Sequence, residues 1–278
     1  MSGVLKRWKL ILAVFLIAVF WTAVGIWFVR SQSDKERASE QIDETQNLVS
    51  AKEVEIPKAD SEEIEAEGSE IKFLDVDLTK LRAKNSETAG WIQVAGTGIN
   101  YPFVQTKDND YYRTHSFDKS YNTAGWPFLD ATNMQDLSDS HSIIYLHGKI
   151  AGSEFEPVRS VVASTSWINS PENFVMRTST EKANAIWQVF SIYKILTTED
   201  YLKVSFSASG ELVDLVKTLK ERSVYKFDVP FSEADKMLTF SIRYDDASIV
   251  AIHGKLVNLS RKEKSSELET SSSEEGVD

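Results

Sequence analysis

The stretch Met237-Leu-Thr-Phe-Ser-Ile-Arg-Tyr-Asp-Asp-Ala-Ser-Ile-Val-Ala-Ile-His-Gly-Lys-Leu-Val257 contains two apolar runs on either side of a short polar connection. Both runs are rich in β-branched and aromatic residues, so we expect strands over residues 237–243 and 248–257. Only residues 244–247 connect them, and Asp245-Asp246 beside Arg243 predict a local ion pair in a tight turn. This pair of strands sets the interpretation of the domain as mainly β.

The segments before this pair extend the same pattern. Further short strands are expected over residues 90–95, 99–105, 125–130, 142–147, 173–178 and 184–196. Helices are expected over residues 75–84, 153–162 and 211–222, the last with Leu212, Leu215, Val216 and Leu219 at helical spacing. About eight short strands with few helices predict a closed β-barrel decorated by helices.

The N-terminal region carries an apolar segment, residues 10–29, which begins at Leu10 and ends at Val29. As a helix it is about 30 Å long, which matches the hydrocarbon core of a bilayer. A cleaved signal peptide is the alternative, but the run is longer than the usual apolar region and no A-x-A-like site follows. Lys6, Arg7 and Lys9 precede the segment, which favours residues 1–9 in the cytoplasm and the remainder outside the cell.

Charge and composition divide the rest of the chain. The 278 residues carry a formal net charge of −11, and residues 1–30 carry +4, which leaves −15 for the remainder. Residues 30–69 are polar and acidic and are expected to form a stalk, with some helix near its start. Residues 70–260 are expected to fold, and residues 261–278 to form a disordered acidic tail. The acidic balance argues against nucleic acid as the main partner.

The chain contains no cysteine. Disulfides, cysteine-ligated zinc, iron–sulfur clusters and thiol catalysis are therefore excluded together. No histidine pair has metal-ligand spacing, and the turn at Gly96-Thr-Gly98 is a hairpin signal without the helix that a phosphate loop needs. No G-x-S-x-G motif is present, which disfavours a serine hydrolase. We expect neither a metal nor a cofactor.

Eight segments together resemble the class B sortases of Gram-positive bacteria. They are Gly90-Trp-Ile-Gln-Val, Ile99-Asn-Tyr-Pro-Phe-Val-Gln, Asp108-Asn-Asp-Tyr-Tyr, Tyr121-Asn-Thr-Ala-Gly-Trp-Pro-Phe-Leu-Asp, Ile143-Ile-Tyr-Leu-His-Gly, Arg222-Ser-Val-Tyr, Leu238-Thr-Phe-Ser and His253-Gly-Lys-Leu. They follow the order of the family and span nearly all of residues 91–257. The resemblance implies a sortase-type closed barrel of about eight strands behind an N-terminal membrane anchor.

The resemblance also implies a chemistry whose usual cysteine nucleophile this chain lacks. Sortases attack a C-terminal sorting signal with a cysteine thiolate and pass the acyl group to an amine, with the help of a histidine and an arginine. By the family pattern, His147 keeps the histidine position and Arg243 stands at the cysteine position. The arginine position falls at Ile249, or at Ser248 if the preceding turn sets the register.

Ser241 is the one hydroxyl that we consider as a substitute nucleophile. It precedes Arg243 by two residues and therefore shares its face of the strand. Arg243 itself stays protonated and cannot attack a carbonyl. His115, His141 and His253 are expected to be structural.

Two functions remain open from the sequence. The first is a non-catalytic, membrane-tethered binding or assembly factor in the attachment of surface proteins or pilins to the cell wall. Its partners would be proteins with a C-terminal sorting signal, together with other sortases. The second is an active transpeptidase with an atypical nucleophile.

Overall fold

The computed structural model describes residues 2–55, 71–147, 167, 174–245 and 247–262. Its centre is a closed barrel in which the strands follow the order β10-β8-β7-β3-β4-β5-β6-β9. The strands are β3 (Thr88–Val94), β4 (Asn100–Val104), β5 (Phe128–Leu129), β6 (His141–His147), β7 (Val175–Thr180), β8 (Ala183–Leu196), β9 (Met237–Arg243) and β10 (Ser248–Arg261). The β4–β5 and β6–β9 pairs are parallel and the other pairs are antiparallel. The predicted eight-stranded closed barrel is confirmed.

Strand β9 shows how the barrel separates two apolar cores. Leu238, Phe240 and Ile242 belong to the main core inside the barrel, whereas Met237 belongs to a second core outside it. Successive side chains of a strand point to opposite faces, so the even positions fill the barrel and the odd positions face outward.

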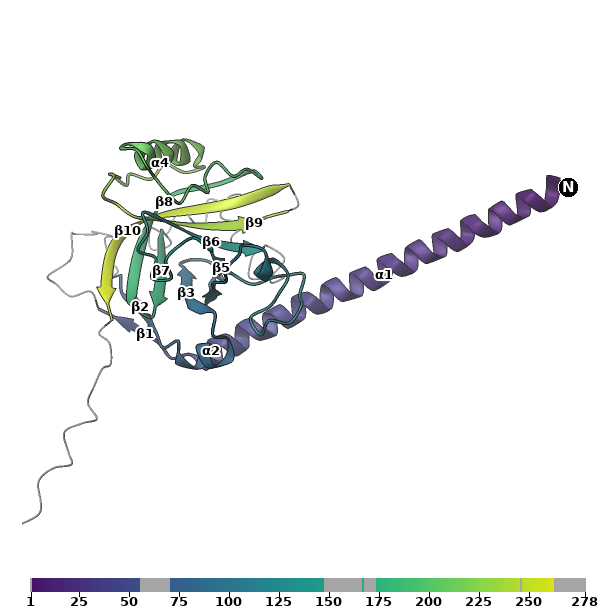
Figure 1. Ribbon diagram of the computed structural model, residues 1–278, viewed down its shortest axis with the longest axis horizontal. Helices are drawn as coiled ribbons and strands as arrows, with labels where there is room; N and C mark the ends of the chain where they lie inside the picture. Colours follow the sequence, from purple (N-terminus) through teal and green to yellow (C-terminus); the bar gives the residue numbers. More distant parts are fainter. Residues whose placement is uncertain (1, 56–70, 148–166, 168–173, 246, 263–278) are drawn as a thin grey trace, which may run out of the picture.

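The second core lies under helix α4 (Glu211–Arg222), at the top of the barrel in Figure 1. Leu212, Val216 and Leu219 of α4 are buried there, a spacing that places all three on one helical face. Ser191 of β8 donates a hydrogen bond to the Leu219 carbonyl at 2.6 Å. The helix expected over residues 211–222 is therefore present and covers the outer face of β8 and β10.

Helix α1 (Ser2–Leu48) runs without a break from the apolar segment to the barrel (Figure 1). It is long and apolar enough to cross a membrane by length and composition. Its last third packs on the domain through a stripe of buried residues: Asp34, Ala38, Ile42 and Thr45. The stalk expected over residues 30–69 is thus helical to Leu48 and docked on the barrel rather than separate from it.

Smaller elements complete the fold. Strand β1 (Ala51–Val54) pairs with β2 (Phe73–Val76), and helix α2 (Thr79–Lys84) follows. The helix expected over residues 75–84 is therefore shorter than predicted, because its first residues pair in β2. The strand expected over residues 125–130 is reduced to β5, and a 3-10 turn, η1 (Tyr111–Arg113), precedes it. The helix expected over residues 153–162 lies outside the described residues.

Candidate functional site

The ends of strands β6, β9 and β10 bring the sequence-predicted site residues into one row. His147 pairs with Arg243 in the parallel β6–β9 ladder, and Arg243 pairs with Ile249 in the antiparallel β9–β10 ladder. Neighbouring strands lie about 4.8 Å apart, so His147 and Ile249 flank Arg243 at about one strand spacing on either side. We refer to His147, Arg243 and Ile249 as the rim row.

The faces of the strands fix where the rim row points. Ile242 fills the barrel, so Arg243 lies on the outward face and is partly exposed. Ile249 is buried in the outer core under α4. Ser248 stands one residue before Ile249 and closes the turn, where its carbonyl accepts a hydrogen bond from the Tyr244 amide at 3.0 Å. Register therefore places Ile249, and not Ser248, directly opposite Arg243.

The connection between β9 and β10 is held by Asp245. Its carboxylate accepts hydrogen bonds from the Ser248 hydroxyl at 2.6 Å and from the Ala247 amide at 2.9 Å, and it lies 3.5 Å from the Lys194 ammonium. The Ser248 bond, followed by the Ala247 bond, lowers the pKa of Asp245 to about 2. Asp245 therefore pairs with Lys194 across the sheet rather than with Arg243 as expected, and Asp246, the other half of that expectation, lies outside the described residues.

Ser241 is occupied by another partner. Its side chain is buried on the outer face of β9, and its hydroxyl lies 2.8 Å from the phenol oxygen of Tyr201. Burial of the Tyr201 ring raises the pKa of that phenol above its ordinary value of 10. Tyr201 therefore stays protonated near neutral pH and offers no base that could activate the Ser241 hydroxyl.

A buried polar chain crosses the outer faces of β6, β9 and β10 beside Ser241. The His141 Nδ1 lies 2.7 Å from the Lys203 carbonyl, and its Nε2 lies 2.6 Å from the Thr239 hydroxyl. The same hydroxyl lies 2.8 Å from His253 Nδ1, and His253 Nε2 lies 3.1 Å from the Tyr193 hydroxyl. Both histidines are fully buried.

The donor and acceptor of every hydrogen bond in this buried polar chain follow from the carbonyl at its end. The Lys203 carbonyl only accepts, so His141 Nδ1–H donates to it, and the Nε2 of a neutral His141 must accept from Thr239. Thr239 then accepts from His253 Nδ1–H, which leaves His253 Nε2 to accept from Tyr193. Burial lowers the pKa of His141 to about 4, and burial together with His141 lowers the pKa of His253 well below 6.5. Both rings are therefore neutral, as suits structural histidines.

His115 lies elsewhere, in the loop that precedes β5. Its ring stacks on Tyr111 with a centroid distance of 4.0 Å, and its Nδ1 lies 2.8 Å from the Tyr111 carbonyl. The four histidines of the protein thus lie in three separate places: His141 and His253 in the buried hydrogen-bonded chain, His115 in the loop before β5, and His147 in the rim row.

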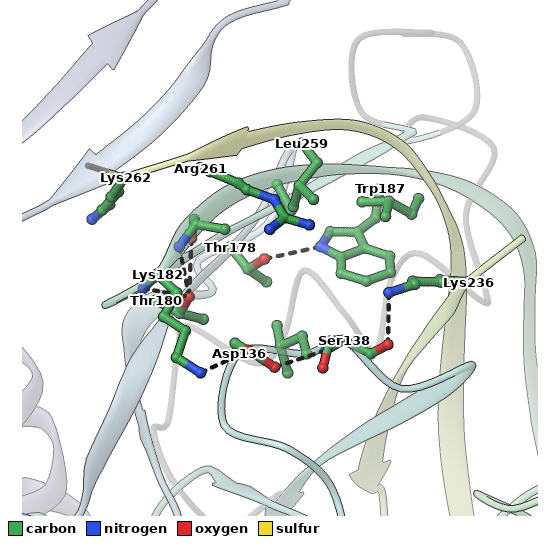
Figure 2. A pocket seen from close by; sticks show the side chains of 14 residues that line it. Asp136, Ser138, Thr178, Thr180, Lys182, Trp187, Lys236, Leu259, Arg261 and Lys262 are labelled. Atoms are coloured by element: carbon green, nitrogen blue, oxygen red, sulfur yellow. Dashed lines mark hydrogen bonds and ion pairs between the residues drawn. The ribbon is translucent and has the colours of Figure 1, made fainter. Parts of the chain in front are cut away.

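A cavity of about 330 Å³ opens at the other end of the barrel (Figure 2). Trp187 forms part of its lining, and the indole N–H donates to Thr178 Oγ1 at 2.9 Å. The Lys182 amine donates a hydrogen bond to the Asp136 carboxylate, and the Lys236 amine donates one to the Ser138 main-chain carbonyl. These two bonds hold the loop of residues 136–138 at the cavity rim.

Lys236 precedes β9, and Arg243 ends it, so the length of the strand separates this cavity from the rim row. Reasoning from the sequence missed the cavity, because its lining comes from loop 136–138 and from segments of β7, β8 and β10 with no shared motif. Among the described residues, no group of three or more histidine, aspartate or glutamate side chains is placed to hold a metal ion.

Comparisons with known proteins bear on the whole domain. No family model matches the chain. The chain is 30% identical over 186 residues to a sortase B of Listeria monocytogenes, covering 65% of this chain and 74% of that protein. It is 25% identical over 157 residues to a sortase B of Staphylococcus aureus, covering 56% of this chain and 63% of that protein. The crystal structure of sortase B from Bacillus anthracis in complex with AAEK1 has a TM-score of 0.65 and 26% identity, covering 81% of this chain and 98% of that one.

Proposed function

The chain belongs to the class B sortase family, and from that premise we propose that it is a membrane-anchored sortase-like protein that binds its partners without cleaving them. One observation carries the proposal. The reaction of the family needs a thiolate, and no cysteine occurs anywhere in the 278 residues.

The rim row supports the same proposal. Arg243 occupies the position that the family pattern gives to the nucleophile, and a guanidinium stays protonated and has no electron pair to attack a carbonyl. The residue directly opposite, Ile249, is a buried hydrocarbon that donates no hydrogen bond to a developing oxyanion. The two changes remove both the attacking group and the group that would stabilise the charge it creates.

The outward position of Arg243 suits a binding role. A partly exposed guanidinium offers several N–H donors in a planar fork, which matches carboxylate and carbonyl oxygens of a peptide. We propose that the ligands are C-terminal sorting signals of surface proteins or pilins, and that other sortases are further partners. In this arrangement residues 1–9 are cytoplasmic, residues 10–29 cross the membrane, and the barrel lies outside the cell.

An active transpeptidase with an atypical nucleophile is the second candidate. Ser241 is the residue that it would need, because it shares the outward face with Arg243. The hydrogen bond to Tyr201 and the burial of both side chains weigh against it.

The test compares binding with turnover. The full-length chain in detergent micelles is titrated into fluorescent peptides that carry sorting signals of active sortase B enzymes, and anisotropy reports binding. The same peptides with a fluorophore and quencher, given triglycine as the amine, report cleavage. We expect saturable binding that Arg243→Ala weakens, and no cleavage. If no such peptide is either bound or cleaved, the proposal is contradicted.

Matched variants separate the two candidates. The Ser241→Ala and His147→Ala variants should show no cleavage, like the unaltered chain. Cleavage by the unaltered chain that either substitution abolishes would establish the second candidate instead. Arg243→Cys should not restore normal turnover, because loss of one oxyanion donor alone typically costs about 10²–10³ in rate.

A further inference from the structure

The cavity at the end of the barrel opposite the rim row is open because small residues line one side of it. Ala183 and Ala185 of β8 precede Trp187 at alternate positions, so all three side chains point to the same face of the strand. In the β8–β10 ladder Ala183 pairs with Arg261, and Ala185 pairs with Leu259. Two methyl groups thus stand where the next inward position carries an indole, and about 330 Å³ stays open beside them.

The inner wall of the cavity is largely hydrocarbon. Trp187 is buried, and its indole N–H already donates to Thr178 Oγ1 at 2.9 Å, so the ring offers the cavity its apolar surface. Leu137, from the loop before β6, adds aliphatic surface, as do Leu256 and Leu259 of β10. Such a wall favours a ligand with an aromatic or branched apolar body.

The mouth of the cavity is positively charged, although the chain as a whole carries a formal net charge of −11. The lining contains one carboxylate and four cations: Asp136, Lys182, Lys236, Arg261 and Lys262. Lys182 lies 3.1 Å from Asp136, which neutralises its charge. Lys262 is neutralised in the same way by Asp75, at 2.7 Å. Two cations therefore remain to attract an anion into the cavity.

These two cations are Arg261 and Lys236. Neither forms an ion pair with any residue that the structure describes, and the Lys236 amine donates to the neutral Ser138 carbonyl at 2.6 Å. The Arg261 side chain is exposed, and within the described part of the chain it has no hydrogen-bond partner. Figure 2 shows it extending from β10 toward Trp187. An unpaired guanidinium presents a planar fork of N–H donors that matches the two oxygens of a carboxylate.

We propose that this cavity binds a small carboxylate that carries an aromatic or branched apolar body. Arg261 pairs with the carboxylate at the mouth, Lys236 supplies a second positive charge there, and Trp187 contacts the apolar body. Ligand pockets commonly have volumes of about 300–1,000 Å³. A cavity of about 330 Å³ lies at the lower end of that range, which suits a ligand of about the size of one aromatic amino acid.

The proposed site is separate from the rim row. Strand β9, Met237–Arg243, begins directly after Lys236 and spans about 20 Å to the rim row at its other end. Of the described residues that line the cavity, none belongs to the rim row. Binding of a carboxylate here therefore neither requires nor excludes binding of a sorting signal at Arg243.

Fluorine nuclear magnetic resonance tests the proposal at Trp187 itself. The full-length chain in detergent micelles is labelled with fluorotryptophan, and the Trp187→Phe variant identifies the resonance of Trp187 among those of the seven tryptophans. Hydrocinnamate, a phenyl ring on a short carboxylate chain, is the probe, and hydrocinnamamide is its uncharged match. Trp21, inside the apolar segment, reports any partition of the probes into the micelle.

We expect hydrocinnamate to shift the Trp187 resonance saturably, with half-saturation at a few millimolar or below, and hydrocinnamamide to bind about 10-fold more weakly. Arg261→Gln should weaken the binding of hydrocinnamate about 10-fold or more, because it removes the charged partner of the carboxylate. Lys217→Gln, on the exposed face of α4, removes the same charge far from the cavity and should leave the affinity unchanged.

Three results would overturn the proposal. Hydrocinnamate could leave the Trp187 resonance in place, it could bind no more tightly than hydrocinnamamide, or it could bind equally well to the Arg261→Gln variant. The resonances of the other tryptophans show whether that variant is folded, so that a loss of binding is distinguished from a loss of structure. The comparison of acid with amide uses the unaltered chain and tests the proposal independently of any variant.

Discussion

Replacing Thr239 by valine should destabilise the barrel by a few kcal/mol, although the two side chains have nearly the same shape. The Thr239 hydroxyl donates to His141 Nε2 at 2.6 Å and accepts from His253 Nδ1 at 2.8 Å. Valine removes both bonds and leaves one buried acceptor and one buried donor without partners. Each unsatisfied buried group costs about 1–3 kcal/mol, so the two together cost about 2–6 kcal/mol.

The assay is urea unfolding of the full-length chain in detergent micelles, followed by near-ultraviolet circular dichroism. Thr218→Val on the exposed face of α4 is the matched control, because the same change in chemistry there leaves no buried group unpaired. Surface substitutions of that kind usually stay within about 0.5 kcal/mol. A Thr239→Val loss no larger than that of Thr218→Val would refute the directed chain of hydrogen bonds.

Three further predictions follow from the same structure. In the folded chain the pKa values of His141 and His253 lie below the unfolded value of 6.5, so the unfolded chain binds more protons below that pH. The urea midpoint should therefore fall as the pH drops from about 6.5 toward about 4. A midpoint that stays constant over this range would contradict the prediction. Leu219→Ala should lower the free energy of unfolding by about 2–5 kcal/mol in the same assay, because the Leu219 side chain is fully buried on the inner face of α4. Lys217→Ala on the exposed face of α4 should cost little. Gly90→Ala should lower the unfolding temperature sharply, because its Cβ would lie 2.6 Å from the Phe103 ring and 2.7 Å from the Ser179 carbonyl; a near-neutral result would show that β3 and β4 separate easily.

The barrel was predictable because its strands carry their pattern locally. In β9 and β10 the alternation and the apolar runs are visible in consecutive residues, and α4 shows its buried face at regular helical spacing. Strand β5 was overextended in the prediction, because the apolar run around it is buried outside the sheet, as at Trp126.

The docking of α1 was not predictable from hydropathy. Its buried stripe includes Asp34 and Thr45, polar residues that hide an otherwise regular pattern of buried positions. Asp34 is satisfied by a loop 89 residues away, a contact that no local signal reveals. Burial opposes ionisation of the Asp34 carboxyl. The hydrogen bonds that Asp34 accepts from Thr123, together with the positive charge of Arg37, outweigh burial and lower the pKa of Asp34.

The rim row shows the same contrast between local and distant information. The position of each member was assigned by family resemblance, whereas the pairing of Arg243 with Ile249 rather than Ser248 is seen only in the β9–β10 register. The hydrogen bond that occupies Ser241 comes from Tyr201, 40 residues earlier, and was outside the reach of sequence reasoning.

The central claim is that this sortase homologue binds without forming a covalent intermediate. Intact-protein mass spectrometry of the full-length chain, after incubation with sorting-signal peptides and no amine acceptor, tests it most directly. We predict a single mass equal to that of the unmodified chain, under conditions where an active sortase B accumulates its acyl-enzyme. An added mass equal to the acyl part of the peptide, present in the unaltered chain and absent from Ser241→Ala, would contradict the claim.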